Sequence, residues 1–178
     1  MAGDDPLSGR PPQASEVTFA RTMTPLDANL LGKVHGGVIM HEVDSAAGIA
    51  AARHAGHVCV TVAIDELSFY QPVNVGDVLF VHARVNAVGS KSLEVGVRVE
   101  AEPWHGGERR HTTSAYLVLV GLDEDGKPAG VRPLVAETDD DRRRERQAGI
   151  RRQFRKERIE RLGTYGPVPG VQPGTRKP

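Results

Sequence analysis

The chain has 178 residues, a length that suits one domain with additional tail segments rather than two domains. It contains 39% hydrophobic and 26% charged residues, and its 23 basic residues balance 23 acidic ones, so no overall charge points to nucleic acid or to a membrane surface. We find no cationic-then-apolar signal at the N-terminus and no apolar run long enough to span a bilayer.

Cysteine and histidine content bears on the compartment and on metals. Cys59 is the single cysteine, which excludes an intramolecular disulfide and fits a reducing compartment, so we expect a cytoplasmic protein with Cys59 as a small buried hydrophobe in a strand. His54 and His57 lie close to it, but no second close pair of ligand types accompanies them. The sequence therefore predicts no metal site and no cofactor.

Composition divides the chain into four parts. Residues 1–14 are small, polar and proline-containing, and we expect them to be disordered. Residues 15–136 carry nearly all the branched apolar residues and form the predicted globular domain. A highly charged segment, 137–162, is followed by a Pro/Gly-rich tail, 163–178, in which we expect no ordered core.

The domain begins with an alternating segment, 15–23, that predicts a strand, and a loop follows over 24–35. Residues 36–55 contain a run of Ala, Ile, Val and Met without proline, which predicts a helix of about 16 residues. Gly36 and Gly37 open it, and Gly56 is a good candidate for its C-cap.

After the helix, apolar and polar residues alternate with period two in four stretches, separated by turn-forming residues. These stretches are 57–73, 77–88, 92–104 and 109–122. The order of strand, one long helix and then a meander of long antiparallel strands predicts an α+β fold. Because the helix is rich in Ala and Gly, we expect the sheet to approach it closely and wrap around it.

Three segments of the chain resemble the acyl-CoA thioesterase family of the hotdog fold. They are DANLLGKVHGGVIMHEVDSAAGIAAARHAG, SFYQPVNVGDVLFVHARVNAVGSKSLEVGVRVEAE and LVAETDDDRRR, and the likeness covers about residues 16–146. The resemblance implies a single hotdog domain, a long central helix wrapped by an antiparallel sheet. It also implies hydrolysis of fatty acyl-CoA to free acid and coenzyme A, with coenzyme A as part of substrate and product.

The predicted helix start offers a way to polarise a thioester carbonyl. Backbone N–H groups in the first turn of a helix have no intrahelical partner, and the helix dipole adds positive potential there. Gly36 and Gly37 allow a ligand to approach closely, so the N–H of Gly37 or Val38 is a candidate oxyanion donor. The alternative is that the two glycines serve only to make a tight turn into the helix.

Asp44 is the candidate general base. It follows Gly37 by seven residues, about 10 Å along the same face, and it interrupts an apolar stretch in which a carboxylate would be partly desolvated. Periodicity alone favours a solvated polar stripe of His41, Asp44 and Ser45. The resemblance implies instead that Asp44 is the catalytic carboxylate; we expect it to activate water, with direct nucleophilic attack as the minor alternative.

Asn29 and His35 precede the helix. The resemblance implies that Asn29 works with an aspartate of another domain or subunit, and hence that two equivalent sites form at a homodimer interface. The alternative is a turn-forming asparagine. His35, like Gly36, is a candidate substrate contact, but a structural role at the helix start fits it at least as well.

Coenzyme A recognition is predicted at two places. Ser90, Lys91 and Ser92 at a turn are favoured over Arg109 and Arg110 on a strand as donors to phosphate, although any one of them also fits a solvated surface position. By resemblance, the pantetheine arm runs past Thr61 and Val62.

The charged segment predicts an exposed helix. Thr138 is a good N-cap, with Asp139, Asp140 and Asp141 against the positive end of the helix dipole. Ten basic residues follow between positions 142 and 161, with a thin apolar set of Ile150, Phe154, Ile159 and Leu162. Binding of nucleic acid or an anionic membrane is one interpretation; we favour a helix that docks weakly on the oligomer and screens coenzyme A phosphates.

Together these features predict a medium- or long-chain acyl-CoA thioesterase. By resemblance it forms dimers in which two sheets join, assembled as a trimer of dimers. The alternatives are an acyl-CoA-sensing hotdog protein without turnover, and a hydratase, which lacks a matching Asp/His pair here.

Overall fold

The computed structural model describes residues 8–163. Its chain forms one strand, a long helix, four further strands and a second helix. These are β1 Val17–Thr22, α1 Gly36–Ala55, β2 Cys59–Phe69, β3 Asp77–Val88, β4 Ser92–Pro103, β5 Arg110–Gly121 and α2 Asp139–Leu162, with short 3-10 helices at Pro12–Ser15 and Pro25–Asp27. The predicted α+β class and each predicted strand are confirmed.

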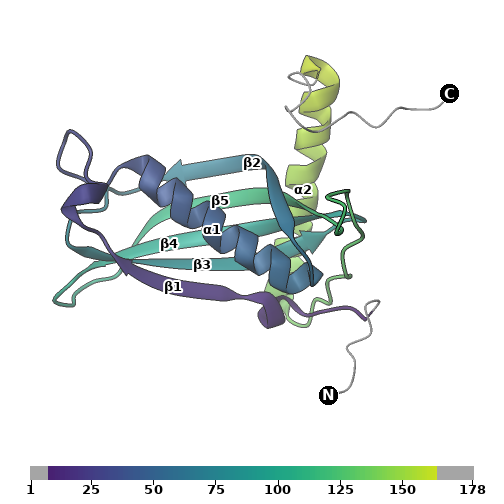
Figure 1. Ribbon diagram of the computed structural model, residues 1–178, viewed down its shortest axis with the longest axis horizontal. Helices are drawn as coiled ribbons and strands as arrows, with labels where there is room; N and C mark the ends of the chain where they lie inside the picture. Colours follow the sequence, from purple (N-terminus) through teal and green to yellow (C-terminus); the bar gives the residue numbers. More distant parts are fainter. Residues whose placement is uncertain (1–7, 164–178) are drawn as a thin grey trace.

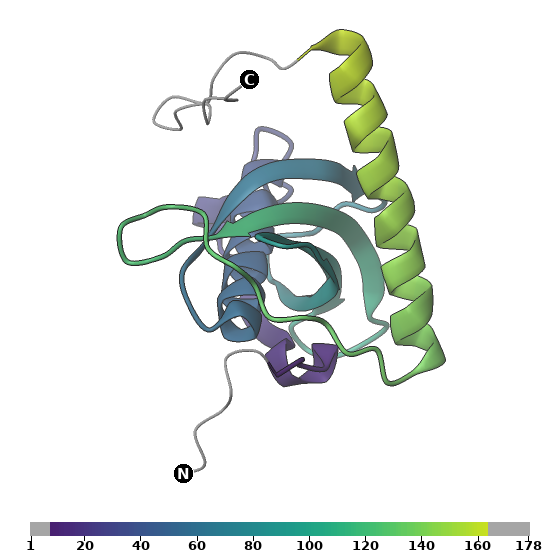
Figure 2. The same cartoon turned by 90° about the vertical axis from the view of Figure 1, so that its right-hand side faces the viewer.

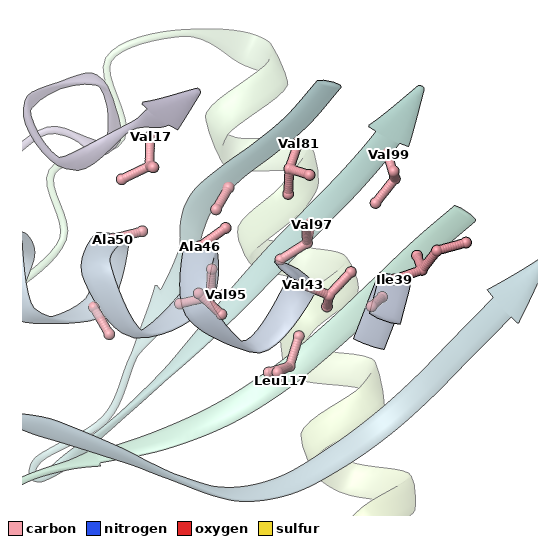
Figure 3. Packing of buried hydrophobic residues seen from close by; sticks show 14 of the residues in the cluster. Val17, Ile39, Val43, Ala46, Ala50, Val81, Val95, Val97, Val99 and Leu117 are labelled. Carbon is pink, nitrogen blue, oxygen red and sulfur yellow. The ribbon is translucent and has the colours of Figure 1, made fainter. Parts of the chain in front are cut away.

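The five strands form one antiparallel sheet in the order β1-β3-β4-β5-β2, curved around α1 (Figure 1). The buried face of α1 is built from small residues that allow close approach to the sheet. Figure 3 shows Val43, Ala46 and Ala50 of the helix packed against inward-facing valines of β3 and β4 and against Leu117 of β5. The predicted wrapping of an Ala-rich helix is therefore confirmed.

Both predicted ends of the long helix are confirmed, although at 20 residues the helix is longer than the expected 16. Gly56 adopts the left-handed conformation, with φ 82°, and its N–H donates to the carbonyl oxygen of Ala52. This backbone conformation suits glycine because an L side chain is strained there.

Part of the N-terminal segment is ordered, and the expectation of disorder through residue 14 is wrong from Ser8 onward. The N–H of Arg10 donates to the carbonyl oxygen of Pro133, and the N–H of Val135 donates back to Arg10. Ser15 is buried beside His54. These two backbone hydrogen bonds and the burial of Ser15 hold in place a segment whose composition predicts few core residues. Residues 1–7 and the predicted tail after Gly163 lie outside the described residues.

Helix α2 lies across the outer face of the sheet, on the opposite side from α1 (Figure 2). The Thr138 cap is confirmed: Thr138 Oγ1 accepts from the N–H of Asp141 at 3.1 Å, and an Asp141 carboxylate oxygen accepts from the N–H of Thr138 at 2.9 Å. No helix within residues 8–163 is long and apolar enough to cross a membrane.

The predicted exposure of the thin apolar set of α2 is confirmed for the single chain, and docking of this helix on another subunit stays a prediction. Ile150, Phe154, Ile159 and Leu162 are all exposed. The helix contacts the sheet through buried Ala148 and through ion pairs, among them Arg151 with Glu94 of β4 at 2.6 Å and Arg155 with Asp65 of β2.

Candidate active site

The loop that leads into α1 is held by a buried carboxylate. Asp27 accepts hydrogen bonds from the N–H and hydroxyl of Thr24, at 2.7 and 2.8 Å, and pairs with Arg21 at 2.6 Å. The Thr24 backbone hydrogen bond is the main cause that holds the pKa of Asp27 below its usual value. Arg21 also binds Glu42 of α1 at 2.6 Å, and the Asp27 carbonyl accepts from the N–H of His35 at 2.8 Å. These contacts fix the loop against the first turns of the helix.

The N–H groups at the helix start are not equally available. The Nδ1 atom of His35 accepts from the N–H of Gly37 at 2.9 Å, and the His35 carbonyl accepts from the N–H of Val38 at 3.0 Å. Within residues 8–163, the N–H of Gly36 donates to no protein acceptor. Thus His35 acts here as a helix cap, and the predicted donors Gly37 and Val38 are both engaged. An oxyanion at Gly37 would have to displace the imidazole.

A close neighbour disfavours a side chain at Gly37, whereas a Cβ at Gly36 would make only an ordinary van der Waals contact. A Cβ at Gly37 would lie 2.8 Å from His35 Nδ1, and one at Gly36 would lie 3.4 Å from the Phe69 ring. The two glycines therefore make the tight turn into the helix that the alternative interpretation predicted. They also leave the backbone of Gly36 open to a small ligand.

Asp44 lies on the side of α1 that is next to the edge strand β2. It is exposed in the single chain, as is His41, and Asp44 Oδ1 accepts a hydrogen bond from the Thr61 hydroxyl at 2.7 Å. The surrounding side chains are apolar and unusually exposed: Met40 is 42% exposed and Val62 is 50% exposed. In one chain alone Asp44 is therefore solvated, and its desolvation would require a surface that covers this apolar face.

Thr61 is a site residue that sequence reasoning placed differently. The resemblance implied only that pantetheine passes it, whereas in the structure its hydroxyl orients the Asp44 carboxylate across 17 residues of sequence. A polar β-branched residue in the apolar run VCVTVAI was the available signal.

Asn29 has the turn-forming contacts of the alternative interpretation. Its Oδ1 accepts from the N–H groups of Leu31 and Lys33, at 2.8 and 3.2 Å. Its side-chain nitrogen donates to no acceptor within the described residues, and Asn29 lines an apolar groove of about 360 Å³ together with Gly36 and Phe69. A single chain therefore brings Asn29 to the helix start, where its amide N–H is available to a ligand.

Asn29 and Asp44 do not meet in one chain. Asp44 follows Gly36 by eight residues, which is roughly 12 Å along the helix axis at 1.5 Å per residue. A small reacting group beside Gly36 and Asn29 is thus distant from the Asp44 carboxylate of the same chain.

The two predicted phosphate-binding groups lie at opposite ends of the sheet. Arg110 begins β5 and Arg109 directly precedes it, at the end of the sheet where Phe69 of β2 meets Gly36. The Ser90–Ser92 turn lies at the other end, where the Lys91 carbonyl accepts from the N–H of Gly121. One chain alone therefore does not gather them around one ligand.

Both arginines already have protein partners. Arg110 binds Asp77 at 2.8 Å, and Arg109 binds Glu102 at 2.8 Å while its guanidinium stacks 3.6 Å from the centre of the Phe80 ring. These contacts favour a structural role for the arginines over phosphate binding. Ser90 and Lys91, by contrast, are exposed.

Cys59 and its neighbours have structural contacts. Cys59 is half-buried in β2, and burial raises the pKa of its thiol to about 11, which disfavours the thiolate. His57 Nε2 lies 3.0 Å from the carbonyl oxygen of Gly130. Within residues 8–163 no group of three potential ligand residues is close enough to hold a metal ion.

Comparisons with known proteins agree on one family. Residues 31–105 match the model of the Thioesterase superfamily. The chain is 36% identical over 132 residues, 73% of its length, to the cytosolic acyl coenzyme A thioester hydrolase of Rattus norvegicus, of which it spans only 35%. It is 35% identical to an uncharacterised acyl-CoA thioester hydrolase of Bacillus subtilis, with 71% of this chain and 74% of that protein covered.

Solved structures give the same likeness. The structure of an apo-hexameric acyl-CoA thioesterase superposes with a TM-score of 0.82 at 34% identity, covering 85% of this chain and 97% of the other. Acyl-CoA hydrolase from Staphylococcus aureus, in complex with butyryl coenzyme A, coenzyme A and coenzyme A disulfide, gives 0.79 at 30% identity, covering 87% and 92%. Further structures of that hydrolase carry alanine in place of an aspartate, an asparagine or a threonine.

Proposed function

This chain belongs to the thioesterase superfamily, and from that premise we propose that it hydrolyses medium- or long-chain acyl-CoA to a fatty acid and coenzyme A. The observation that carries the proposal is the hydrogen bond from Thr61 to Asp44 on an exposed apolar face of α1. The chain spans about a third of the mammalian relatives it matches, so the activity of those longer proteins is support and no more.

Asp44 acts as the general base. The Thr61 hydroxyl occupies Oδ1 and orients the carboxylate, so that Oδ2 is free to accept a proton from water. As the water oxygen attacks the thioester carbonyl carbon, charge develops on the carbonyl oxygen. The free N–H of Gly36 at the start of α1 stabilises this charge, and the N–H of Gly37 joins it once the His35 imidazole moves away. The carbon–sulfur bond then breaks, and coenzyme A leaves as the thiol.

The working site contains two copies of the chain. The edge strand β2 pairs with β5 on one side only within the described residues, and its apolar residues Val60 and Ile64 are exposed. A second copy that covers this face would desolvate Asp44 and bring the Asn29 loop and helix start of the partner to it. The roughly 12 Å between Gly36 and Asp44 of one chain supports such sharing.

The related structures support the same residues and assembly. The three positions replaced by alanine in the S. aureus hydrolase are spaced along that chain as Asn29, Asp44 and Thr61 are here. The hexameric relative supports a trimer of dimers as the assembly of this chain. The name of the cytosolic rat protein supports a cytoplasmic location.

Binding without turnover is the second candidate function. It is favoured by the His35 imidazole, which holds the N–H of Gly37 and must move before an oxyanion can bind there. A sensor of acyl-CoA would need neither that movement nor a base.

Thiol release from acyl-CoA of increasing chain length, acetyl to palmitoyl, tests the proposal. We expect turnover that Asp44→Asn lowers by at least 100-fold while coenzyme A binding changes less than threefold, because the amide retains shape but cannot accept the proton. Thr61→Val should lower kcat by a smaller factor with little change in KM. Saturable palmitoyl-CoA binding without any released thiol would refute the hydrolase and favour the sensor.

A further inference from the structure

A second pocket lies on the outer face of the sheet and is lined by residues of β3, β4, β5 and α2. Figure 2 shows the sheet between α2 and α1, so this pocket lies on the other side of the sheet from α1. Its volume is about 370 Å³, within the range of small-molecule sites. Its lining is strongly basic and includes Arg84, Arg98, Arg143, Arg144, Arg151 and His82. The single carboxylate in the lining is Glu16.

The floor of this pocket depends on a glycine. Gly96 of β4 pairs with Arg84 of β3 on one side and with Tyr116 of β5 on the other. The Asn86 amide lies over Gly96, and a Cβ there would come within 2.5 Å of Asn86 Nδ2. Any side chain at position 96 would fill the space that the arginines surround.

The arginines are oriented by carboxylates that, apart from Glu16, stand outside the lining. Arg98 Nε binds Glu100 at 2.9 Å and Arg144 Nε binds Asp140 at 2.6 Å. Arg151 binds Glu94 at 2.6 Å and stacks 3.7 Å from the centre of the Tyr116 ring. These pairs nearly balance the charge, so the pocket would select a ligand by directed N–H groups rather than by net potential.

Several of those N–H groups are unused. Within residues 8–163, the two terminal nitrogens of Arg98 and the two of Arg144 donate to no protein acceptor. Forked guanidinium donors from two sides suit an anion with many oxygens, and phosphate groups match this geometry best.

We propose that this pocket binds a small molecule carrying two linked phosphate groups, at a site distinct from the acyl-CoA site. One phosphate meets Arg98 on the sheet and the other meets Arg144 on α2. Because the donors come from both elements, the ligand fastens α2 to the sheet and raises the melting temperature by mass action.

The probe is pyrophosphate, titrated calorimetrically into the full chain at low salt with saturating coenzyme A present. We expect saturable binding with one site per chain, and at least tenfold weaker binding to Arg98→Gln/Arg144→Gln. The matched control, Arg146→Gln/Arg161→Gln, removes the same charge from exposed positions outside the lining and should change the Kd less than twofold. No saturable binding, or equal weakening in both double variants, would overturn the proposal.

Two further arms keep the test decisive. If the Arg98/Arg144 variant does not fold, Gln147→Glu adds a carboxylate to the lining while leaving these ion pairs in place, and it should weaken pyrophosphate binding to a similar degree. If pyrophosphate binds only when coenzyme A is left out, and the Arg98/Arg144 variant also binds coenzyme A at least tenfold more weakly, the pocket belongs to the acyl-CoA site and a distinct site is refuted. Both results are independent of whether the chain hydrolyses thioesters.

Discussion

The two faces of the sheet are covered by two helices of opposite chemistry. On the inner face, α1 presents Val43 and alanines that are fully buried against valines and leucines. On the outer face, α2 buries Ala148 and is otherwise held by ion pairs such as Arg151 with Glu94. The contact between α1 and the sheet therefore supplies most of the free energy of folding, because apolar burial outweighs partly exposed ion pairs.

Substitutions at two neighbouring positions of β5 should show the largest difference in stability between the inner and outer faces of the sheet. Leu117 is fully buried on the inner face, and Val118 lies on the outer face beneath α2. We expect Leu117→Ala to lower the free energy of unfolding by about 2–5 kcal/mol, because it leaves a cavity in the core. Urea denaturation measures the loss. Val118→Ala is the control, and an equal or larger loss there would contradict the comparison.

The buried carboxylate under α2 gives the next largest expected effect. Glu94 accepts from Arg151 and from Asn86 Nδ2, so Glu94→Gln should lower the free energy of unfolding by roughly 1.5–3 kcal/mol. The loss should appear with faster hydrogen exchange in α2 and unchanged protection in α1. An equal loss of hydrogen-exchange protection in both helices would mean that α2 unfolds together with α1 rather than separately from it.

The helix cap isolates the contribution of α2 itself. Thr138→Ala removes the hydroxyl that accepts from the N–H of Asp141 and should cost about 1 kcal/mol, whereas Thr138→Ser should be nearly neutral. Circular dichroism during thermal unfolding checks both variants. Equal losses for alanine and serine would mean that the hydroxyl is not what matters.

A pH effect at the end of α1 is the smallest that we predict. Burial lowers the pKa of His54, with its proximity to Arg10 and Arg132 acting in the same direction. The folded state therefore favours neutral imidazole, so stability is full above the unfolded pKa of about 6.5 and falls as pH drops toward the lower folded pKa. His54→Gln should reduce the slope of unfolding free energy between pH 7.5 and 5. An unchanged slope would exclude His54 as its source.

The sequence predicted the fold closely because its signals are local. Period-two alternation marks β3 and β4 nearly to the residue, and Gly56 and Thr138 mark helix ends through backbone chemistry that neighbours alone determine. Residues 10–14 were misjudged because their order comes from distant hydrogen bonds to Pro133 and Val135. No local pattern shows which face of α2 meets the sheet either, because ion pairs with strands far along the chain orient the helix.

The candidate site divides in the same way. By itself, the sequence determined which residues are polar within apolar runs, namely Asp44 and Thr61, and that the glycines at 36 and 37 open the helix. The folded structure was needed to show that Thr61 donates to Asp44 and that arginines from three elements, β3, β4 and α2, surround Gly96. Such contacts join residues far apart in the chain, and no local pattern encodes a distance between them.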